Sequence, residues 1–134
     1  MKAALLKGMV FFVAVLLFLA QPVWARTNGF CYVIGYSYQQ KIAYFSPVIM
    51  QKVDGTSYSS EEYVTEVALT QKLESQFSKH LFRTVHLDTA RYTIAARGVY
   101  KNDAIAGEKL NTEMNEYKAR GYTIKTVQDF VVAN

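Results

Sequence analysis

Cysteine and histidine are scarce in this chain, and their scarcity limits the chemistry that it can support. Cys31 is the only cysteine, so no disulfide can form within one chain and the fold must be held together by its core. His80 and His86 are the only histidines, and Asp88 follows the second one closely. A stable zinc site normally needs more than a pair of protein ligands. We therefore predict neither a metal site nor a cofactor.

Recognisable catalytic motifs are also missing. The chain has no glycine-rich phosphate loop, no Gly-x-Ser-x-Gly elbow and no His-Glu-x-x-His helix. A site assembled from distant residues, such as Cys31 with a histidine, remains an alternative because such partners meet only in the fold. A lone cysteine on a tyrosine-rich segment is more often a small buried apolar residue. An enzyme is the less favoured class, and no catalytic residue is predicted.

The most specific feature of the sequence is its N-terminus. Lys2 and Lys7 precede an uninterrupted apolar run over residues 9–20, and Val23-Trp24-Ala25 places compact residues where a signal peptidase reads. A transmembrane span needs about 20 apolar residues, and this run ends well short of that length. Residues 1–25 are therefore predicted to be a signal peptide. We expect the rest of the chain to be exported to the periplasm or secreted, with no stable membrane anchor after cleavage.

The exported part, residues 26–134, has the length of one domain and little net charge. It comprises 109 of the 134 residues, and the loss of Lys2 and Lys7 lowers the net charge from +4 to +2. So small a charge gives no support for a surface that binds polyanions, and an exported protein rarely meets nucleic acid. We predict a single domain with no nucleic-acid partner.

The first segment of this domain has the pattern of a β-hairpin. Residues 30–38 alternate tyrosine and isoleucine with smaller side chains, and residues 41–50 are again rich in residues that favour strands. Pro47 cannot donate a hydrogen bond to a neighbouring strand. The second strand is therefore expected to end near Ser46 or to lie at a sheet edge there.

A helix is predicted to follow over residues 60–81. Ser59 and Glu62 have the spacing of a capping box, and the apolar residues beyond them recur at near-helical intervals. Residues 82–90 fit a short strand or a connecting loop equally well.

The last segment reads as strand, helix and strand. Residues 91–100 alternate in polarity, Asn102 is a favoured N-cap, Gly121 suits a helix C-cap, and residues 122–132 alternate again. A single long helix over residues 90–118 is the competing interpretation. It ranks second because Gly98 and the pair Asn102-Asp103 are poor residues for a helix interior.

Together these segments predict an α+β fold. The expected arrangement is a two-layer sandwich in the order β-β-α-β-α-β, with a mixed four-stranded sheet and both helices packed on one face. The other face of the sheet would then be open to solvent.

That open face supplies the candidate binding site. Several tyrosines fall on the predicted strands, and tyrosine combines a large contact area with a polar tip. Most are expected in the core, but those on the uncovered side would form a platform for a partner. The candidate binding residues, which would form a mildly basic face, are Arg91, Thr93, Arg97, Thr123 and Lys125.

We therefore favour a small exported binding or interaction module that uses an open sheet face or a strand edge to hold a protein or peptide partner. One alternative is an enzyme or enzyme inhibitor with a site built from Cys31 and a histidine. Another is a structural protein that forms a homodimer, either through the exposed face or through an exposed Cys31 paired between two chains.

Overall fold

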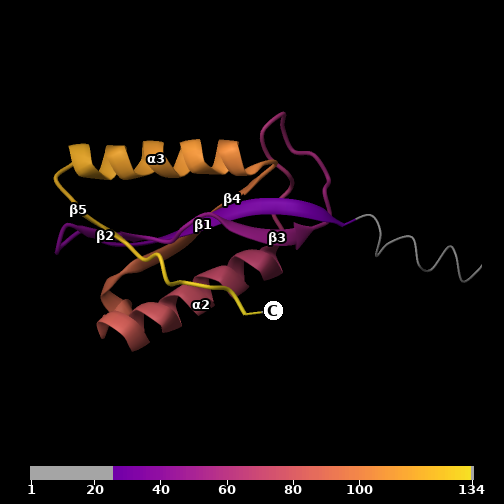
Figure 1. The fold of residues 1–134 in the computed structure, drawn as a ribbon. Coiled ribbons are helices and arrows are strands. Elements are labelled where there is room, and N and C mark those ends of the chain that lie inside the picture. Colours follow the sequence, from indigo (N-terminus) through magenta and orange to yellow (C-terminus); the bar gives the residue numbers. More distant parts are fainter. Residues whose placement is uncertain (1–25, 134) are drawn as a thin grey trace, which may run out of the picture.

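A computed structural model describes residues 26–133, so the predicted signal peptide lies outside the described residues. Three strands, a helix, a strand, a second helix and a final strand follow one another along the chain (Figure 1). Their bounds are β1 (Thr27–Ser37), β2 (Ile42–Phe45), β3 (Ile49–Val53), α2 (Val67–Val85), the 3-10 turn η1 (Thr89–Arg91), β4 (Thr93–Tyr100), α3 (Asp103–Ala119) and β5 (Thr123–Thr126). The α+β class and the mixed sheet are as predicted, but the sheet of the described residues has five strands and not four, because the second predicted strand is divided at Pro47 into β2 and β3.

The sheet is built around β1. β4 pairs antiparallel with one edge of β1, while β2 and β3 pair antiparallel with successive parts of its other edge. β5 then adds to β2 in parallel. β4 and β5 run in the same direction but are not neighbours, because β1 and β2 lie between them. The α3 crossover therefore passes over two strands.

The break between β2 and β3 falls at Pro47, as the sequence indicated. β2 ends at Phe45 and β3 begins at Ile49. Ser46 keeps the two halves aligned with β1, because its amide donates to the Val33 carbonyl at 2.9 Å and its hydroxyl accepts from the Val33 amide at 2.8 Å. The serine side chain thus satisfies a backbone donor at the point where proline interrupts the strand.

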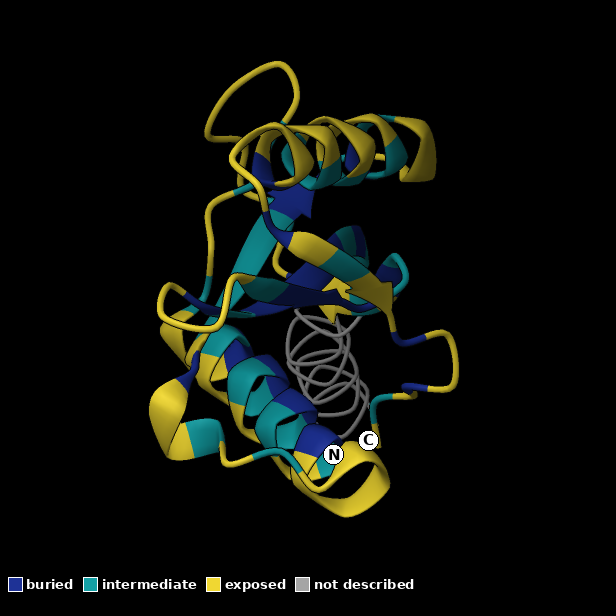
Figure 2. Cartoon of the chain, turned by 90° about the vertical axis from the view of Figure 1, so that its left-hand side faces the viewer, coloured by how far each residue is buried: buried dark blue, intermediate teal, exposed yellow. Residues whose placement is uncertain are grey.

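The two helices pack on opposite faces of the sheet, so the prediction of a two-layer sandwich with one open face was wrong (Figures 1 and 2). Alternate residues of β1 enter two separate cores: Cys31 and Val33 join the α2 side, whereas Tyr32 and Ile34 join the α3 side. Successive side chains of a strand point to opposite faces. Since both sets are apolar, both faces need a cover, and the chain forms three layers.

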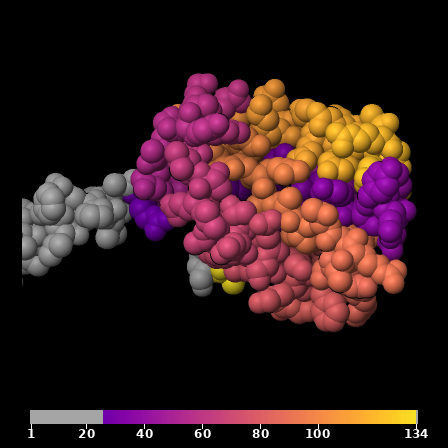
Figure 3. Space-filling model, turned by 180° about the vertical axis from the view of Figure 1, so that it is seen from behind, coloured from indigo at the N-terminus to yellow at the C-terminus, as the bar shows by residue number. Residues whose placement is uncertain are grey.

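The first helix starts later than expected. Ser59 does accept hydrogen bonds from the amides of Glu61 and Glu62 through its hydroxyl, but this capped turn is not continued, and α2 begins at Val67. The loop instead pairs with the end of β4, where the Tyr63 amide donates to the Val99 carbonyl at 2.9 Å. Figure 3 shows residues 54–66 as a lobe beside the start of α3.

The strand, helix and strand order predicted for residues 91–132 is confirmed, and the alternative of one long helix is excluded. The Asn102 side chain caps α3 by accepting from the Ile105 amide at 2.8 Å. The final strand is shorter than expected, because the chain leaves the sheet after Thr126 and the Phe130 ring packs against Phe77 of α2 at a centroid distance of 5.0 Å.

A glycine at position 29 is needed because β1 passes very close to its neighbours there. A Cβ atom at Gly29 would lie 2.2 Å from Cγ1 of Val99 and 3.0 Å from Cγ2 of Val53. We expect Gly29→Ala to lower the free energy of unfolding by about 1–3 kcal/mol through overpacking, measured by urea denaturation followed by circular dichroism.

The matched control is Gly107→Ala, where the added Cβ meets nothing within 4 Å. Because Gly107 lies inside α3, this change should raise stability by roughly 0.5–1 kcal/mol. A Gly29→Ala protein as stable as the parent would contradict the packing described for β1.

Candidate functional site

The five residues predicted to form a basic face do not come together. Thr93 and Arg97 lie on β4 with their side chains on the α3 side, whereas Thr123 and Lys125 lie on β5, on the α2 side. Arg91 belongs to the turn η1, where it forms an ion pair with Asp88 at 3.3 Å. They are separated because β1 and β2 lie between β4 and β5, and because the side chains on these two strands point to opposite faces of the sheet.

Arg97 contributes to the attachment of α3 rather than to an open surface. Its guanidinium binds the Glu113 carboxylate at 3.1 and 3.2 Å, and the Tyr32 hydroxyl donates to the same carboxylate at 2.7 Å. Burial of the Tyr32 ring, followed by the Glu113 interaction, raises the pKa of the phenol above its ordinary value. The tyrosine therefore stays neutral and donates. This network joins β1, β4 and α3, which gives it a clear structural role.

Cys31 and the two histidines occupy separate environments. Cys31 is 2% exposed within the core on the α2 side, while His80 binds Asp129 at 3.2 Å and His86 is an exposed C-cap of α2. Within residues 26–133 no hydrogen bond joins the thiol to either histidine. The described residues thus show no assembled thiol–imidazole pair, and burial removes Cys31 from the surface that a covalent dimer would need.

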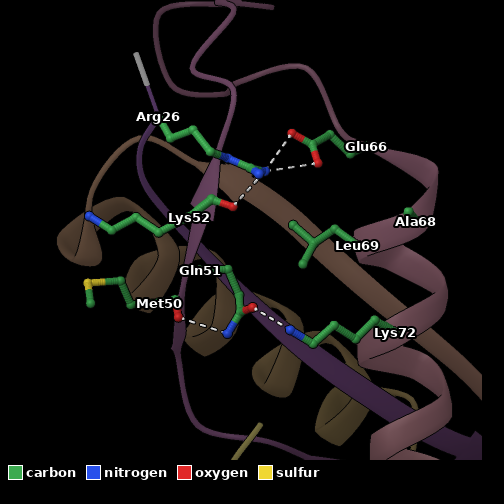
Figure 4. A pocket seen from close by; sticks show the side chains of 8 residues that line it. All are labelled: Arg26, Met50, Gln51, Lys52, Glu66, Ala68, Leu69 and Lys72. Carbon is green, nitrogen blue, oxygen red and sulfur yellow. Dashed lines mark hydrogen bonds and ion pairs between the residues drawn. The ribbon is translucent and has the colours of Figure 1, made fainter. Parts of the chain in front are cut away.

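A groove of about 510 Å³ lies between β3 and the start of α2 (Figure 4). Its apolar lining includes the buried Leu69 and the exposed Ala68, both from α2. Polar and longer side chains complete its lining, which consists of Arg26, Met50, Gln51, Lys52, Glu66, Ala68, Leu69 and Lys72. The groove therefore runs beside a strand edge, with a helix as its second wall.

The outer edge of β3 has no partner strand among residues 26–133. The Val33 carbonyl accepts from Ser46, so odd-numbered residues of β1 direct their backbone groups toward β2 and β3. Backbone groups alternate in direction along a strand, and Gln51 is the register partner of the odd-numbered Gly29. Gln51 therefore bonds to β1, while Met50 and Lys52 direct their amides and carbonyls outward.

The outward carbonyls of Met50 and Lys52 each accept a hydrogen bond from a side chain. Gln51 Nε2 donates to the Met50 carbonyl at 3.0 Å, and Arg26 Nη2 donates to the Lys52 carbonyl at 3.4 Å. Both contacts are exposed to solvent. The amides of Met50 and Lys52 point away from β1, and neither has a hydrogen-bond acceptor in the described part of the chain. The edge thus retains donors, and its acceptors are held by contacts that water or a ligand can replace.

One end of the groove is closed by an ion pair. Arg26 Nη2 lies 3.5 Å from the Glu66 carboxylate, which also accepts from the Asp54 amide at 3.1 Å. Glu66 precedes the first turn of α2, where the unpaired amides of the helix favour negative charge. At the other end, Lys72 Nζ donates to Gln51 Oε1 at 3.3 Å. The lining of the groove therefore combines apolar residues of α2 with an excess of basic side chains.

The sequence held one signal for this site, which is Pro47. Pro47 indicated that the second strand ends near Ser46 or lies at a sheet edge there, and β2 does end at Phe45. That a separate strand, β3, follows the proline and forms a sheet edge was not predicted. The position of α2 beside that edge was not predictable, since it depends on how the loop over residues 54–66 leads the chain across the sheet. Sequence reasoning placed the site on a face and missed the groove at the edge.

Comparison of the chain with protein-family models, with curated proteins and with solved structures found no match. Among residues 26–133, neither α2 nor α3 is long and apolar enough to cross a membrane. The same residues contain no group of three or more histidine, cysteine, aspartate or glutamate side chains that could hold a metal ion.

Burial should make the Cys31 thiol nearly inert. The apolar surroundings raise its pKa from 9.0 to about 12, so the reactive thiolate is about 1,000-fold rarer at pH 8 than for a free cysteine. We expect the folded protein to react with an aromatic disulfide reagent far more slowly than the same protein in denaturant. A folded-state rate within tenfold of the denatured rate would show that Cys31 is accessible and would restore the thiol-based alternatives.

Proposed function

We propose that residues 26–134 form an exported binding module that accepts an extended peptide segment as an added strand on the outer edge of β3. The observation that carries this proposal is the unpaired edge of Met50 and Lys52 lying along a groove walled by α2. Strand addition uses the main chain of both partners for affinity and pockets beside the edge for specificity. Export is inferred from the sequence of residues 1–25.

The groove offers both main-chain groups for pairing and a lining that side chains of the peptide can contact. An added strand would bond to the amides and carbonyls of Met50 and Lys52, displacing the exposed contacts from Gln51 and Arg26. Such exposed contacts contribute little free energy, so their displacement costs little. Every second side chain of the peptide would face α2 and meet Leu69 and its neighbours.

The other sheet edges are less suitable. The outer edge of β4 is covered near its end by the loop, through the bonds from Tyr63 to Val99 and from Lys101 to Glu61. β5 spans only four residues, and none of them lines the groove beside β3. β3 is therefore the edge at which main-chain pairing and side-chain recognition coincide.

A variant that fills the groove provides the test. Ala68 is exposed and lines the groove, so Ala68→Trp should obstruct an added strand without disturbing the core. We propose affinity selection from a phage-displayed library of random linear peptides, followed by titration of the selected peptides. Ala68→Trp should weaken their binding at least ~10-fold, which corresponds to about 1.4 kcal/mol.

Gln71→Trp is the matched control, because Gln71 is an exposed residue of the same helix that does not line the groove. It should retain the parent affinity. The proposal fails if no peptide is enriched, or if both tryptophan variants bind the selected peptides as tightly as the parent. A parent protein that sediments as a dimer, and that Ala68→Trp converts to a monomer, would show instead that a second copy occupies the edge.

A further inference from the structure

We propose that the peptide segment recognised at β3 is acidic, with carboxylate side chains on both faces of the added strand. This inference rests on the function proposed for the groove and defines the chemical class of its ligand. It follows from the charges that line the groove and from the way in which a strand distributes its side chains.

The lining of the groove has an excess of positive charge. Of its eight residues, Arg26, Lys52 and Lys72 are cationic and Glu66 is the one carboxylate. Glu66 is already engaged by Arg26 and by the Asp54 amide. The remaining charge is carried by the two lysines, and an incoming segment meets no carboxylate that lacks a partner.

Neither lysine has a carboxylate partner among residues 26–133. Lys72 donates to the neutral amide of Gln51, and no ion pair or hydrogen bond of the Lys52 ammonium occurs in the described part of the chain. A ligand carboxylate would therefore not have to compete with an existing ion pair. Neither lysine is buried, so a carboxylate that pairs with either ammonium group keeps part of its hydration and avoids a large desolvation cost.

The two lysines lie on different sides of the edge. Lys72 projects from α2 into the groove, whereas Lys52 projects from β3 away from it (Figure 4). Side chains of an added strand alternate between the two sides. Adjacent residues of the peptide would thus approach Lys72 and Lys52 respectively, whichever way the peptide runs. A pair of consecutive acidic residues satisfies both lysines.

The peptide selection described above tests this inference through the composition of the selected sequences. We expect Asp and Glu to be enriched at least about threefold over the unselected library when the selection is made at roughly 50 mM salt. The enrichment should shrink in about 1 M salt, which screens charges separated by more than a few ångströms. Replacing Asp and Glu by Asn and Gln in a selected peptide should weaken its binding about tenfold at low salt.

The Lys52→Gln, Lys72→Gln double variant should lose the preference for acidic peptides. Lys79 and Lys118 are exposed lysines of α2 and α3 that lie outside the groove, so Lys79→Gln, Lys118→Gln controls for the change in net charge and should keep the preference. Selected peptides that are neutral or basic would overturn the acidic specificity and leave the strand-accepting function standing. A selection that enriches no peptide would overturn both proposals.

Discussion

Everything in this fold depends on β1, whose eleven residues pair with three strands and carry apolar side chains on both faces. A strand that is apolar on both sides must be covered on both sides, which places α2 and α3 on opposite faces. The close approach at Gly29 and the bond between Val33 and Ser46 fix its neighbours. The fold is therefore stabilised by apolar surface buried on both faces of the sheet, since a single cysteine cannot form a disulfide within the chain.

This arrangement decides where a partner can bind. With a helix on each face, backbone groups remain available at the strand edges, and β3 becomes an edge because Pro47 separates it from β2 while β5 extends only β2. The Arg26–Glu66 pair and the bond from Gln51 to Met50 shield part of that edge. Natural proteins commonly protect exposed sheet edges with charged side chains. Here Lys52 of β3 and Lys72 of α2 also supply the proposed specificity for an acidic peptide.

Local sequence signals predicted the ends of several strands and helices, whereas the packing of distant segments could not be predicted from the sequence. Pro47, the Asn102 cap and the helix stop before Gly121 act within a few residues, so the sequence located the breaks and ends that they cause. At Ser59 half of the capping box forms, since the hydroxyl accepts from the Glu62 amide, but the Ser59 amide donates to the Glu62 backbone carbonyl and not to its carboxylate. No helix follows there, because the loop pairs with β4 instead. The prediction of an open sheet face was wrong because β1 is apolar on both sides, with Cys31 and Val33 on one and Tyr32 and Ile34 on the other, so both faces are buried. The groove depends on contacts between β3 and α2 that no local pattern contains.

The central claim is that the Met50 and Lys52 amides face outward at an open edge, without an acceptor among the described residues, while the Gln51 amide between them bonds to β1. Amide hydrogen exchange, resolved residue by residue by NMR on residues 26–134 without ligand, tests this most directly. We predict exchange at Met50 and Lys52 at least about 100-fold faster than at Gln51. Equal protection of all three amides would show that the edge is already occupied or folded differently, and would contradict the account.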